Sequence, residues 1–282
     1  MTEFDWAQDR GNKWVLQASR LEQMMHDIDQ PVVSLLLDCT AKDENSQYRI
    51  ADLACGNGGT SFELEKSVPA SWVLHGYDIS QALVDSAVSR ASKLRSRVQF
   101  KVADLQEEPE IEATYDLLVS RFGVMFFNDP SRAFSNMRKW LSSEGRFVFA
   151  VWGCPSYNPW MSVVKNVVSN SVQLPITPEG APGPFRYADT RILANELITA
   201  GFEEILVTDW RGKLPIGGGM NPRAAAEFAL STFSVGDVLA VTEPGVQQQA
   251  LDELTSVYAR YEENGIVMMN ALVHLVSGTV RG

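Results

Sequence analysis

The sequence has few cysteines and histidines, and the two do not cluster. Its three cysteines, Cys39, Cys55 and Cys154, are odd in number and widely spaced, and only three histidines occur in 282 residues. No Cys-x-x-Cys pair or Cys/His group indicates a disulfide framework or a zinc site. A chain of this length also buries enough surface to fold without such crosslinks. We therefore expect no metal ion at the functional site.

Positive charge is also scarce. Lys and Arg number 24 against 35 Asp and Glu, which gives a net charge of −11 and a pI near 4.8. The longest run of basic residues is the pair Arg138-Lys139. Because a negatively charged surface repels phosphate backbones, we expect no nucleic-acid partner.

The sequence lacks an apolar run of membrane-spanning length and a basic leader. The first residues, Met1–Asp5, include two acidic side chains, unlike the basic start of a signal peptide. Hydrophobic residues make up 45% and charged residues 21%, as in ordinary globular proteins. We expect a cytoplasmic protein that does not enter membranes. The protein could form a homodimer.

The N-terminal part, residues 1–47, is predicted to be a helical lid. Apolar residues recur there at spacings of 4, 3, 4 and 3, as on one face of a helix: Trp14, Ala18, Leu21, Met25 and Ile28. Pro31 is expected to end this helix, and a second one is expected over Val32–Leu37.

Residues 48–152 alternate between short apolar runs and helical patterns. The runs are Arg49–Ala54, Trp72–Tyr77, Val98–Ala103, Tyr115–Ser120 and Arg146–Trp152. Near-continuous apolar strands that alternate with helices indicate a mostly parallel sheet covered on both faces. Right-handed crossovers make such a sheet doubly wound.

Residues 153–282 are less regular and are predicted to complete the same domain. Six prolines fall within 153–188, which indicates an excursion from the sheet, and a second insertion is predicted over 211–265. Strands are expected at Glu204–Trp210 and Ile266–Ser277. The expected fold is α/β and Rossmann-like, with a doubly wound sheet of seven mostly parallel strands and cap insertions over the substrate.

The sharpest motif is the segment Ile50–Thr60, in which a strand enters a glycine-rich turn that opens a helix. This geometry brings backbone N–H groups against a ligand. Gly56 and Gly58 remove the Cβ atoms that would block the approach. Taken alone, the segment could equally be a turn that binds no ligand.

Two acidic residues follow at the ends of the next two strands. Asp78 lies 22 positions after Gly56, where a carboxylate can accept hydrogen bonds from both hydroxyls of a ribose. Asp104 ends the third strand at the same edge and can take the exocyclic amine of an adenine. The alternative for Asp78 is that it merely precedes a helix cap at Ser80. Together, the turn and both carboxylates point to a ligand that contains adenosine.

A dinucleotide is disfavoured as that ligand, because the glycines do not fit the Gly-x-Gly-x-x-Gly frame. Asp52–Gly58 instead resembles the first motif of class I S-adenosylmethionine-dependent methyltransferases, with Ala54 in place of the first glycine. Four further segments resemble the branch related to ubiquinone/menaquinone C-methyltransferases (type 11 methyltransferase domain): Trp14-Val15, Tyr115–Phe127, Phe134–Phe147 and Ala181–Phe185. The likeness extends over nearly the whole chain and is strongest across 49–152.

The resemblance implies S-adenosylmethionine as the cofactor and a role for individual residues. Backbone at Ala54 and Gly56 would line the methionine part, Asp78 with Ile79 the ribose, and Asp104 with Leu105 the adenine. Ser120 would lie near the sulfonium, and Trp14 would close over the cofactor. The alanine at position 54 fits if its φ is negative, which would give a tighter site.

The expected reaction is in-line methyl transfer to a small molecule, by O-, N- or C-methylation. The sequence identifies no catalytic residue. Weak candidates are His274, on the last predicted strand, and Arg121, directly after the fourth, which could hold an anionic substrate or pair with a carboxylate. Two alternatives remain: non-methylating chemistry with the same cofactor, such as a cyclisation, and a non-catalytic cofactor-binding protein.

Overall fold

The computed structural model describes residues 6–40, 47–107, 114–178 and 180–280. Residues 1–5, from which we argued against a leader, lie outside this part, as do 41–46 of the predicted lid. Seven described strands form one sheet in the order β3-β2-β1-β4-β5-β8-β6, and β7 pairs only with β8. The strands are β1 Arg49–Leu53, β2 Val73–Asp78, β3 Gln99–Val102, β4 Tyr115–Arg121, β5 Leu141–Trp152, β6 Phe202–Pro215, β7 Glu262–Glu263 and β8 Ile266–Val280.

The sheet is parallel from β3 to β5 and antiparallel where β8 enters between β5 and β6. The first strand of the chain therefore lies in the middle, and the carboxyl ends of β1, β2 and β4 meet at one edge. Chain order reverses between β1 and β4, which is the place where ligands bind in open α/β sheets. The predicted α/β, mostly parallel fold is confirmed.

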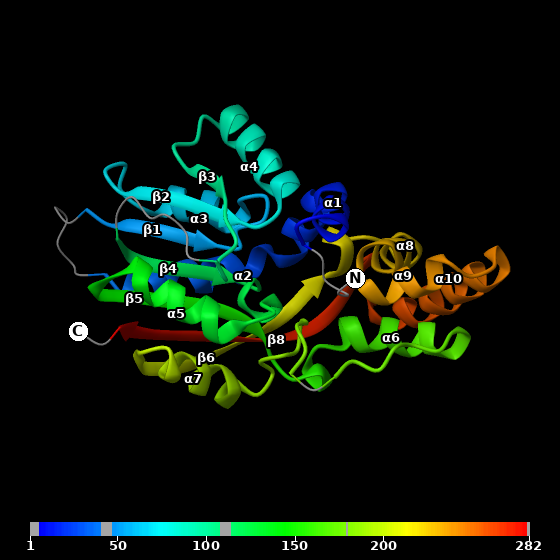
Figure 1. Cartoon of the computed structure of the whole chain (residues 1–282). Coiled ribbons are helices and arrows are strands. Elements are labelled where there is room, and N and C mark those ends of the chain that lie inside the picture. The colour runs from blue at the N-terminus through cyan, green and yellow to red at the C-terminus, as the bar shows by residue number, and fades with distance from the viewer. Residues whose placement is uncertain (1–5, 41–46, 108–113, 179, 281–282) are drawn as a thin grey trace.

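Helices cover both faces of the sheet, with α2 and α3 behind it and α5 and α7 in front in the view of Figure 1. This placement follows from right-handed crossovers on either side of β1. The helices that flank the sheet are α2 Ala18–Asp38, α3 Gly59–Ser67, α4 Gln81–Leu94, α5 Pro130–Trp140 and α7 Thr190–Thr199, and α1 Asp9–Leu16 packs on α4. None of the described helices has both the length and the apolar character needed to cross a membrane.

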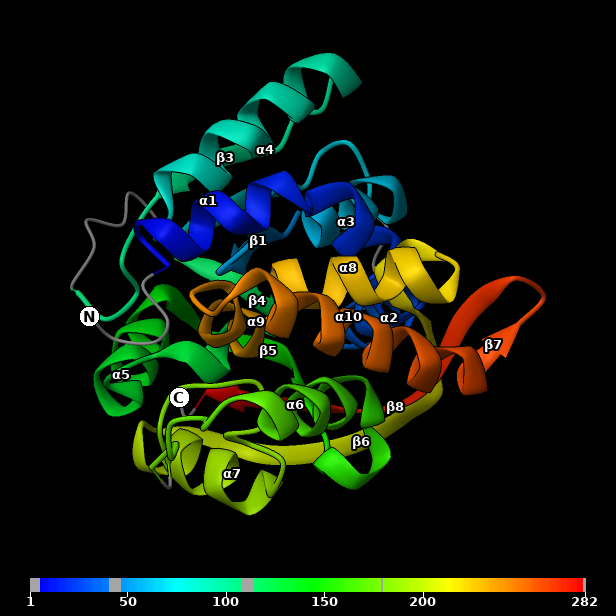
Figure 2. The same ribbon diagram turned by 90° about the vertical axis from the view of Figure 1, so that its right-hand side faces the viewer.

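Four helices gather beyond one end of the sheet, beside α1 (Figures 1 and 2). They are α6 Pro159–Ser171, α8 Pro222–Thr232, α9 Ser234–Ala240 and α10 Pro244–Tyr258. Helix α10 packs on α8 and α6, and α9 contacts α6 and α8. We refer to α6, α8, α9 and α10 as the cap helices.

The expected break at Pro31 was wrong. Helix α2 runs through Pro31 without interruption, and the break lies instead at Gln17, between α1 and α2. Proline lacks the N–H that would bond to the preceding turn, which is costly in a helix interior. The fully buried side chains of Ile28 and Val32 on either side keep the helix packed on the sheet, so burial outweighs the lost bond.

Strands β5, β6 and β8 are longer than the apolar pattern predicted. The pairing of β6 with β8 extends to Pro215 opposite Met268, although most side chains along β6 are partly or fully exposed. An exposed edge strand has no buried face in its sequence, so its length is set by backbone pairing alone. The pattern therefore identified β6 only over its middle.

Packing of the cap helices can be tested at two helical glycines. A Cβ at Gly236 in α9 would lie 1.8 Å from the backbone oxygen of Leu230, whereas a Cβ at Gly245 in α10 would meet nothing within 4 Å. We expect Gly236→Ala to lower the free energy of unfolding by about 1–3 kcal/mol through overpacking. Gly245→Ala should leave it unchanged or raise it by about 0.4–1 kcal/mol. Urea titrations of both variants make the comparison, and equal stabilities would contradict this packing.

Candidate functional site

The glycine-rich turn after β1 brings the backbone into the left-handed region three times, at Ala54 (φ 52°), Gly56 (φ 56°) and Gly58 (φ 86°). Gly58 is the residue that precedes α3, and a Cβ there would lie 2.7 Å from the ring of Phe100. The turn therefore requires glycine at position 58 for both its conformation and its close packing.

Ala54 does not have the negative φ that we expected. A left-handed alanine costs roughly 1–2 kcal/mol, so the surrounding structure must hold it. Its methyl group occupies the space beside Gly123, where an added Cβ would lie 2.3 Å from the Ala54 Cβ. Gly123 in the turn after β4 thus leaves room for the alanine that replaces the usual glycine.

The carboxylate of Asp78, at the end of β2, is bound to two backbone groups. The Gly56 N–H donates to Oδ2 at 2.8 Å, and the Ser80 N–H donates to Oδ1 at 2.9 Å. Burial raises the pKa of Asp78 from 3.8 to about 6, although these hydrogen bonds lower it. Ser80 caps α4, as the alternative interpretation of Asp78 proposed, and the same carboxylate also lines the cavity described next.

A cavity of about 250 Å³ opens at this edge of the sheet. Seven of the eight residues predicted to bind cofactor line it: Trp14, Ala54, Gly56, Asp78, Ile79, Asp104 and Leu105. Ser120, the eighth, is fully buried and not among the lining residues, and its hydroxyl donates to the Leu53 carbonyl at 2.8 Å. Ser120 therefore does not face the cavity, and its hydrogen bond holds the end of β1, directly before the lining residue Ala54.

Asp104 lies two residues beyond β3 and remains partly exposed. Its Oδ1 accepts hydrogen bonds from the backbone N–H of Gln106 at 2.9 Å and from the Gln106 side chain at 3.2 Å. Both bonds end on Oδ1, so within the described residues Oδ2 is available to a donor in the cavity.

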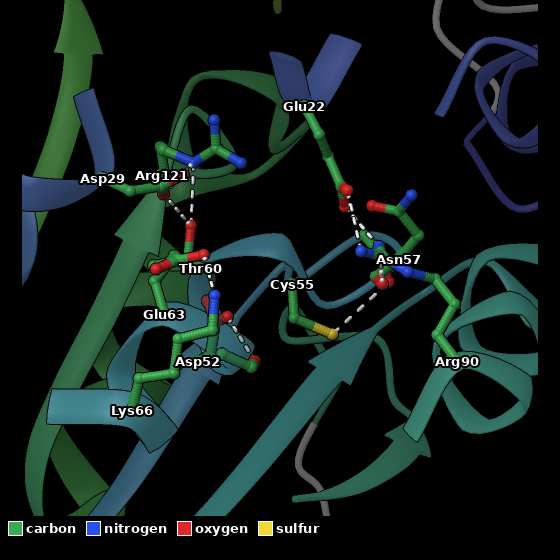
Figure 3. Close-up of polar contacts among 12 residues, drawn as sticks. Glu22, Asp29, Asp52, Cys55, Asn57, Thr60, Glu63, Lys66, Arg90 and Arg121 are labelled. Atoms are coloured by element: carbon green, nitrogen blue, oxygen red, sulfur yellow. Dashed lines mark hydrogen bonds and ion pairs between the residues drawn. The ribbon is translucent and has the colours of Figure 1, made fainter. Parts of the chain in front are cut away.

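Arg121 joins the glycine turn to α2 (Figure 3). Its Nε donates to the Thr60 hydroxyl at 2.7 Å and lies 3.0 Å from Oδ1 of Asp29, which also accepts from that hydroxyl at 2.9 Å. Below them, the Ser61 hydroxyl donates to Asp52 at 2.6 Å, and burial raises the pKa of Asp52 to about 7. Arg121 thus pairs with a carboxylate, one of the two roles the sequence left open, and it also lines the cavity.

A second ion pair fixes the other side of the turn. Arg90 of α4 binds Glu22 of α2 through both nitrogens, one contact being 2.7 Å, and donates to the Asn57 carbonyl at 2.8 Å (Figure 3). Several lining residues carry a buried donor without a hydrogen-bond partner. Nε1 of Trp6 is one, and beside the glycine turn Nδ2 of Asn57 and Nη1 of Arg121 are two more. Unpaired buried N–H groups are costly, and an anion bound beside the turn would satisfy those of Asn57 and Arg121.

Helix α1 packs across the mouth of the cavity. Trp6 contacts Trp14 edge-on at 5.2 Å between ring centroids and Phe126 at 5.1 Å. Arg10 binds Asp237 of α9 at 3.2 Å, and Lys13 binds the same carboxylate. Sequence reasoning missed Trp6 and Arg10 because their partners lie far along the chain, and only the aromatic pair Trp6 and Trp14 in one short segment hinted at this contact.

The side of the cavity that faces the cap helices is aromatic. Phe122, left-handed at φ 65°, stacks on Trp152 with 4.0 Å between ring centroids and 3° between planes. Trp152 contacts Trp160 of α6 at 4.9 Å, and Trp160 contacts Phe233 at 5.3 Å. We call Phe122, Trp152, Trp160 and Phe233 the aromatic wall. The sequence analysis did not identify it.

The three histidines are not among the cavity-lining residues. His274 lies on β8 opposite Val151, and its Nδ1 is 2.6 Å from Oδ1 of Asp209. His75 is buried in β2 with its Nδ1 2.6 Å from the Tyr115 hydroxyl. Within the described ranges, no group of three His, Cys, Asp or Glu side chains could hold a metal ion.

Residues 50–145, which contain the turn and both carboxylates, match the family described as "Methyltransferase domain". This segment is a methyltransferase domain. The match confirms the resemblance seen in the motifs of residues 52–58 and 115–127, and the strand order places the domain in the Rossmann-like class.

Curated relatives share the methyltransferase domain over part of their length. Phosphoethanolamine N-methyltransferase 3 of Arabidopsis thaliana is 26% identical over 57% of this chain and 30% of its own. The ubiquinone/menaquinone biosynthesis C-methyltransferase UbiE of Geotalea uraniireducens is 27% identical over 38% of this chain and 46% of its own. This chain spans less than half the length of each.

Solved structures share the fold at low identity. The YcgJ protein from Bacillus subtilis superimposes with a TM-score of 0.58 at 13% identity, covering 90% of this chain and 99% of that one. The [4+2]-cyclase SpnF gives a TM-score of 0.52 at 18% identity, covering 90% and 82%. These likenesses support the fold of the methyltransferase domain.

The buried carboxyl of Asp78 predicts how stability depends on pH. Its pKa is higher in the folded protein than its ordinary value, so the folded state binds the proton more tightly and this contribution is lost as pH rises from about 4 through about 6. We expect the stability of the wild type relative to Asp78→Asn to fall by on the order of 2–3 kcal/mol between about pH 4 and pH 7.

Urea unfolding of both proteins across this pH range measures the difference. Asp52, whose pKa is raised chiefly by burial, is present in both proteins, so the burial part of its contribution cancels, and only the smaller part that comes from the charge of Asp78 differs. A difference that stays constant with pH would contradict a raised pKa at Asp78.

Proposed function

We propose that the chain is an S-adenosylmethionine-dependent methyltransferase that acts on a small molecule. The observation that carries this proposal is the convergence of the glycine turn, Asp78 and Asp104 on one cavity within the segment that matches a methyltransferase domain. The turn, Asp78 and Asp104 lie at or just after the carboxyl ends of β1, β2 and β3. The turn offers its backbone to the cavity, and the two aspartates offer carboxylate oxygens. The match of residues 50–145 supports the same cofactor class.

The residues present fit this cofactor in three places. Asp78 accepts from the backbone N–H groups of Gly56 and Ser80 and also interacts with that of Ile79, and a carboxylate has about four lone-pair sites, so acceptor capacity remains for a ribose hydroxyl. The free oxygen of Asp104 suits the adenine amine. The unpartnered donors of Asn57 and Arg121 suit the carboxylate of the methionine part.

When bound, S-adenosylmethionine supplies an electrophilic methyl group on a sulfonium. The chain's own contribution is to hold the acceptor in line with that methyl and to exclude water. Helix α1, held to α9 through Asp237, and the cap helices enclose the space where the two meet. Orientation of this kind contributes on the order of 7–11 kcal/mol to lowering a barrier. We propose that the insertions 153–188 and 211–265 act as this cap and select the substrate.

Cofactor binding tests the assignment of Asp78. We expect micromolar binding of S-adenosylmethionine, which NAD does not match, and a loss of roughly 1.5–3 kcal/mol in Asp78→Ala, the scale for hydrogen bonds that involve a charged group. Asp85→Ala is the matched control, because Asp85 is exposed on α4, accepts a hydrogen bond from the side chain of Gln81 and does not line the cavity. Calorimetry that shows undiminished binding in Asp78→Ala would refute the ribose contact.

Turnover separates methyl transfer from the two alternatives. Label from a methyl-labelled cofactor moves to the acceptor only if the protein is a methyltransferase. A cyclase would convert its substrate with the label retained on the cofactor, and a binding protein would convert nothing. Candidate metabolites are therefore best screened by label transfer.

We expect no histidine to act as general base. The titratable residues lining the cavity, within the described ranges, are Arg10, Cys55, Asp78, Asp104 and Arg121. Burial raises the pKa of Cys55, which keeps that thiol protonated. His274→Gln should then lower kcat by less than about 10²-fold, the low end for general acid–base catalysis.

The control for His274→Gln is Asp209→Asn, which keeps the imidazole but removes the charge of its carboxylate partner and with it the exposed ion pair to Arg211. The measurement is kcat against pH for the wild type and both variants. A loss above about 10³-fold in His274→Gln, with disappearance of a pKa near neutrality, would establish His274 as the base.

A further inference from the structure

The cavity has two chemically different halves. The half beneath the glycine turn carries the charged and hydrogen-bonding side chains, including Asp78, Asp104, Asn57 and Arg121. The half toward the cap helices is lined by apolar side chains, the four of the aromatic wall together with Met161 and Pro184. Ser234, after Phe233, is the one hydroxyl lining that half among the described residues. A ligand that spans both halves must be polar at one end only.

The aromatic wall is rigid. Its four rings contact one another in sequence. Phe122 stacks on Trp152, Trp152 contacts Trp160, and Trp160 contacts Phe233. Trp152, Trp160 and Phe233 are each only 3% exposed, and the Trp160 indole N–H donates to Asn158 at 3.4 Å. Because these side chains are already held in place by their neighbours, they lose little further rotamer freedom when a ligand contacts the parts of them that line the cavity.

Backbone strain at Phe122 serves this arrangement. A non-glycine residue at φ 65° is unfavourable, and such residues cluster at functional sites. The Phe122 N–H donates to the Ala150 carbonyl at 2.9 Å, which extends the pairing of β4 with β5 past the end of β4. This bond fixes the backbone from which the ring reaches Trp152. The unfavourable conformation of Phe122 therefore places its ring against Trp152, as the first member of the aromatic wall.

We infer that the aromatic wall, with Met161 and Pro184, is the acceptor subsite and that it takes a flat, apolar molecule such as an aromatic ring system. This inference rests on the proposed function, which assigns the polar half to the cofactor. A small zwitterionic or phosphorylated acceptor is disfavoured, because its charges would face aromatic and thioether groups, and Arg10, the lining cation that reaches α9, is already paired with Asp237. A planar ring can instead stack against the wall.

The test uses 2-naphthol as a flat apolar probe and phosphoethanolamine as a small charged one. Binding to the full chain is measured by calorimetry, with and without saturating S-adenosylhomocysteine. Quenching of tryptophan fluorescence is a second readout, because Trp152 and Trp160 line the cavity. We expect 2-naphthol to bind and phosphoethanolamine to bind more weakly or not at all.

A pair of variants on α6 identifies the place of binding. Met161→Glu puts a charge in the apolar half, whereas Val163→Glu makes the same kind of change at a half-buried position that does not line the cavity. We expect Met161→Glu to weaken 2-naphthol binding at least about 10-fold and Val163→Glu less than about 2-fold. Neither change should alter binding of S-adenosylhomocysteine, and thermal melts of both variants verify that they fold.

The outcomes separate this inference from the proposed function. Equal binding of 2-naphthol to Met161→Glu and wild type, no binding of 2-naphthol at all, or tighter binding of phosphoethanolamine would each overturn the apolar acceptor subsite. Failure of S-adenosylhomocysteine to bind, with the 2-naphthol pattern intact, would instead overturn the cofactor assignment and leave the aromatic subsite standing.

Discussion

The carboxylate of Asp78 accepts hydrogen bonds from the N–H groups of Gly56 and Ser80, and the geometry of the site depends on this pair of contacts. They hold the end of β2, the glycine turn after β1 and the start of α4 at fixed positions. The same burial that strengthens these bonds raises the pKa of the carboxyl. Further hydrogen-bond donors from a ligand would favour the ionised form, so the carboxyl is arranged to receive hydroxyl groups.

Other parts of the chain support this centre from outside the methyltransferase domain. Helix α2 contributes Glu22 and Asp29, whose ion pairs with Arg90 and Arg121 hold the turn from behind. Helix α1 lies over the cavity and is tied to α9 through Asp237. Of these ion pairs, Arg121 with Asp29 is the buried one, and breaking a buried pair leaves an uncompensated charge, whereas the more exposed pairs add little stability. Their contribution here is to fix where the backbone N–H groups of the turn point.

Much of the fold and of the polar half of the site was predictable from the sequence. Strands β1, β2 and β4 are mostly buried, so each appears as an apolar run, and the glycine turn and Asp78 come at the ends of such runs, whereas β3 at the edge of the sheet is largely exposed. Asp78 was predictable because a residue at the end of a central parallel strand lies at the ligand edge. Seven of the eight predicted residues line the cavity for this reason.

The aromatic wall, the contacts of α1 and the left-handed Ala54 could not be predicted in the same way. Phe122 and Phe233 are 111 positions apart in the chain, and Arg10 and Asp237 are 227 apart, so no local period links them. Ala54 adopts a positive φ because Gly123, in another turn, leaves space for its methyl group. Such features depend on tertiary contacts between loops, which sequence patterns of helices and strands do not record.

A crystal structure of the chain with S-adenosylhomocysteine tests the account most directly. The account predicts that both ribose hydroxyls lie within hydrogen-bond distance of the Asp78 carboxylate and that the amino-acid carboxylate lies at Asn57 and Arg121. The sulfur should then face the aromatic wall. A ligand bound elsewhere, or one whose ribose does not contact Asp78, would contradict it.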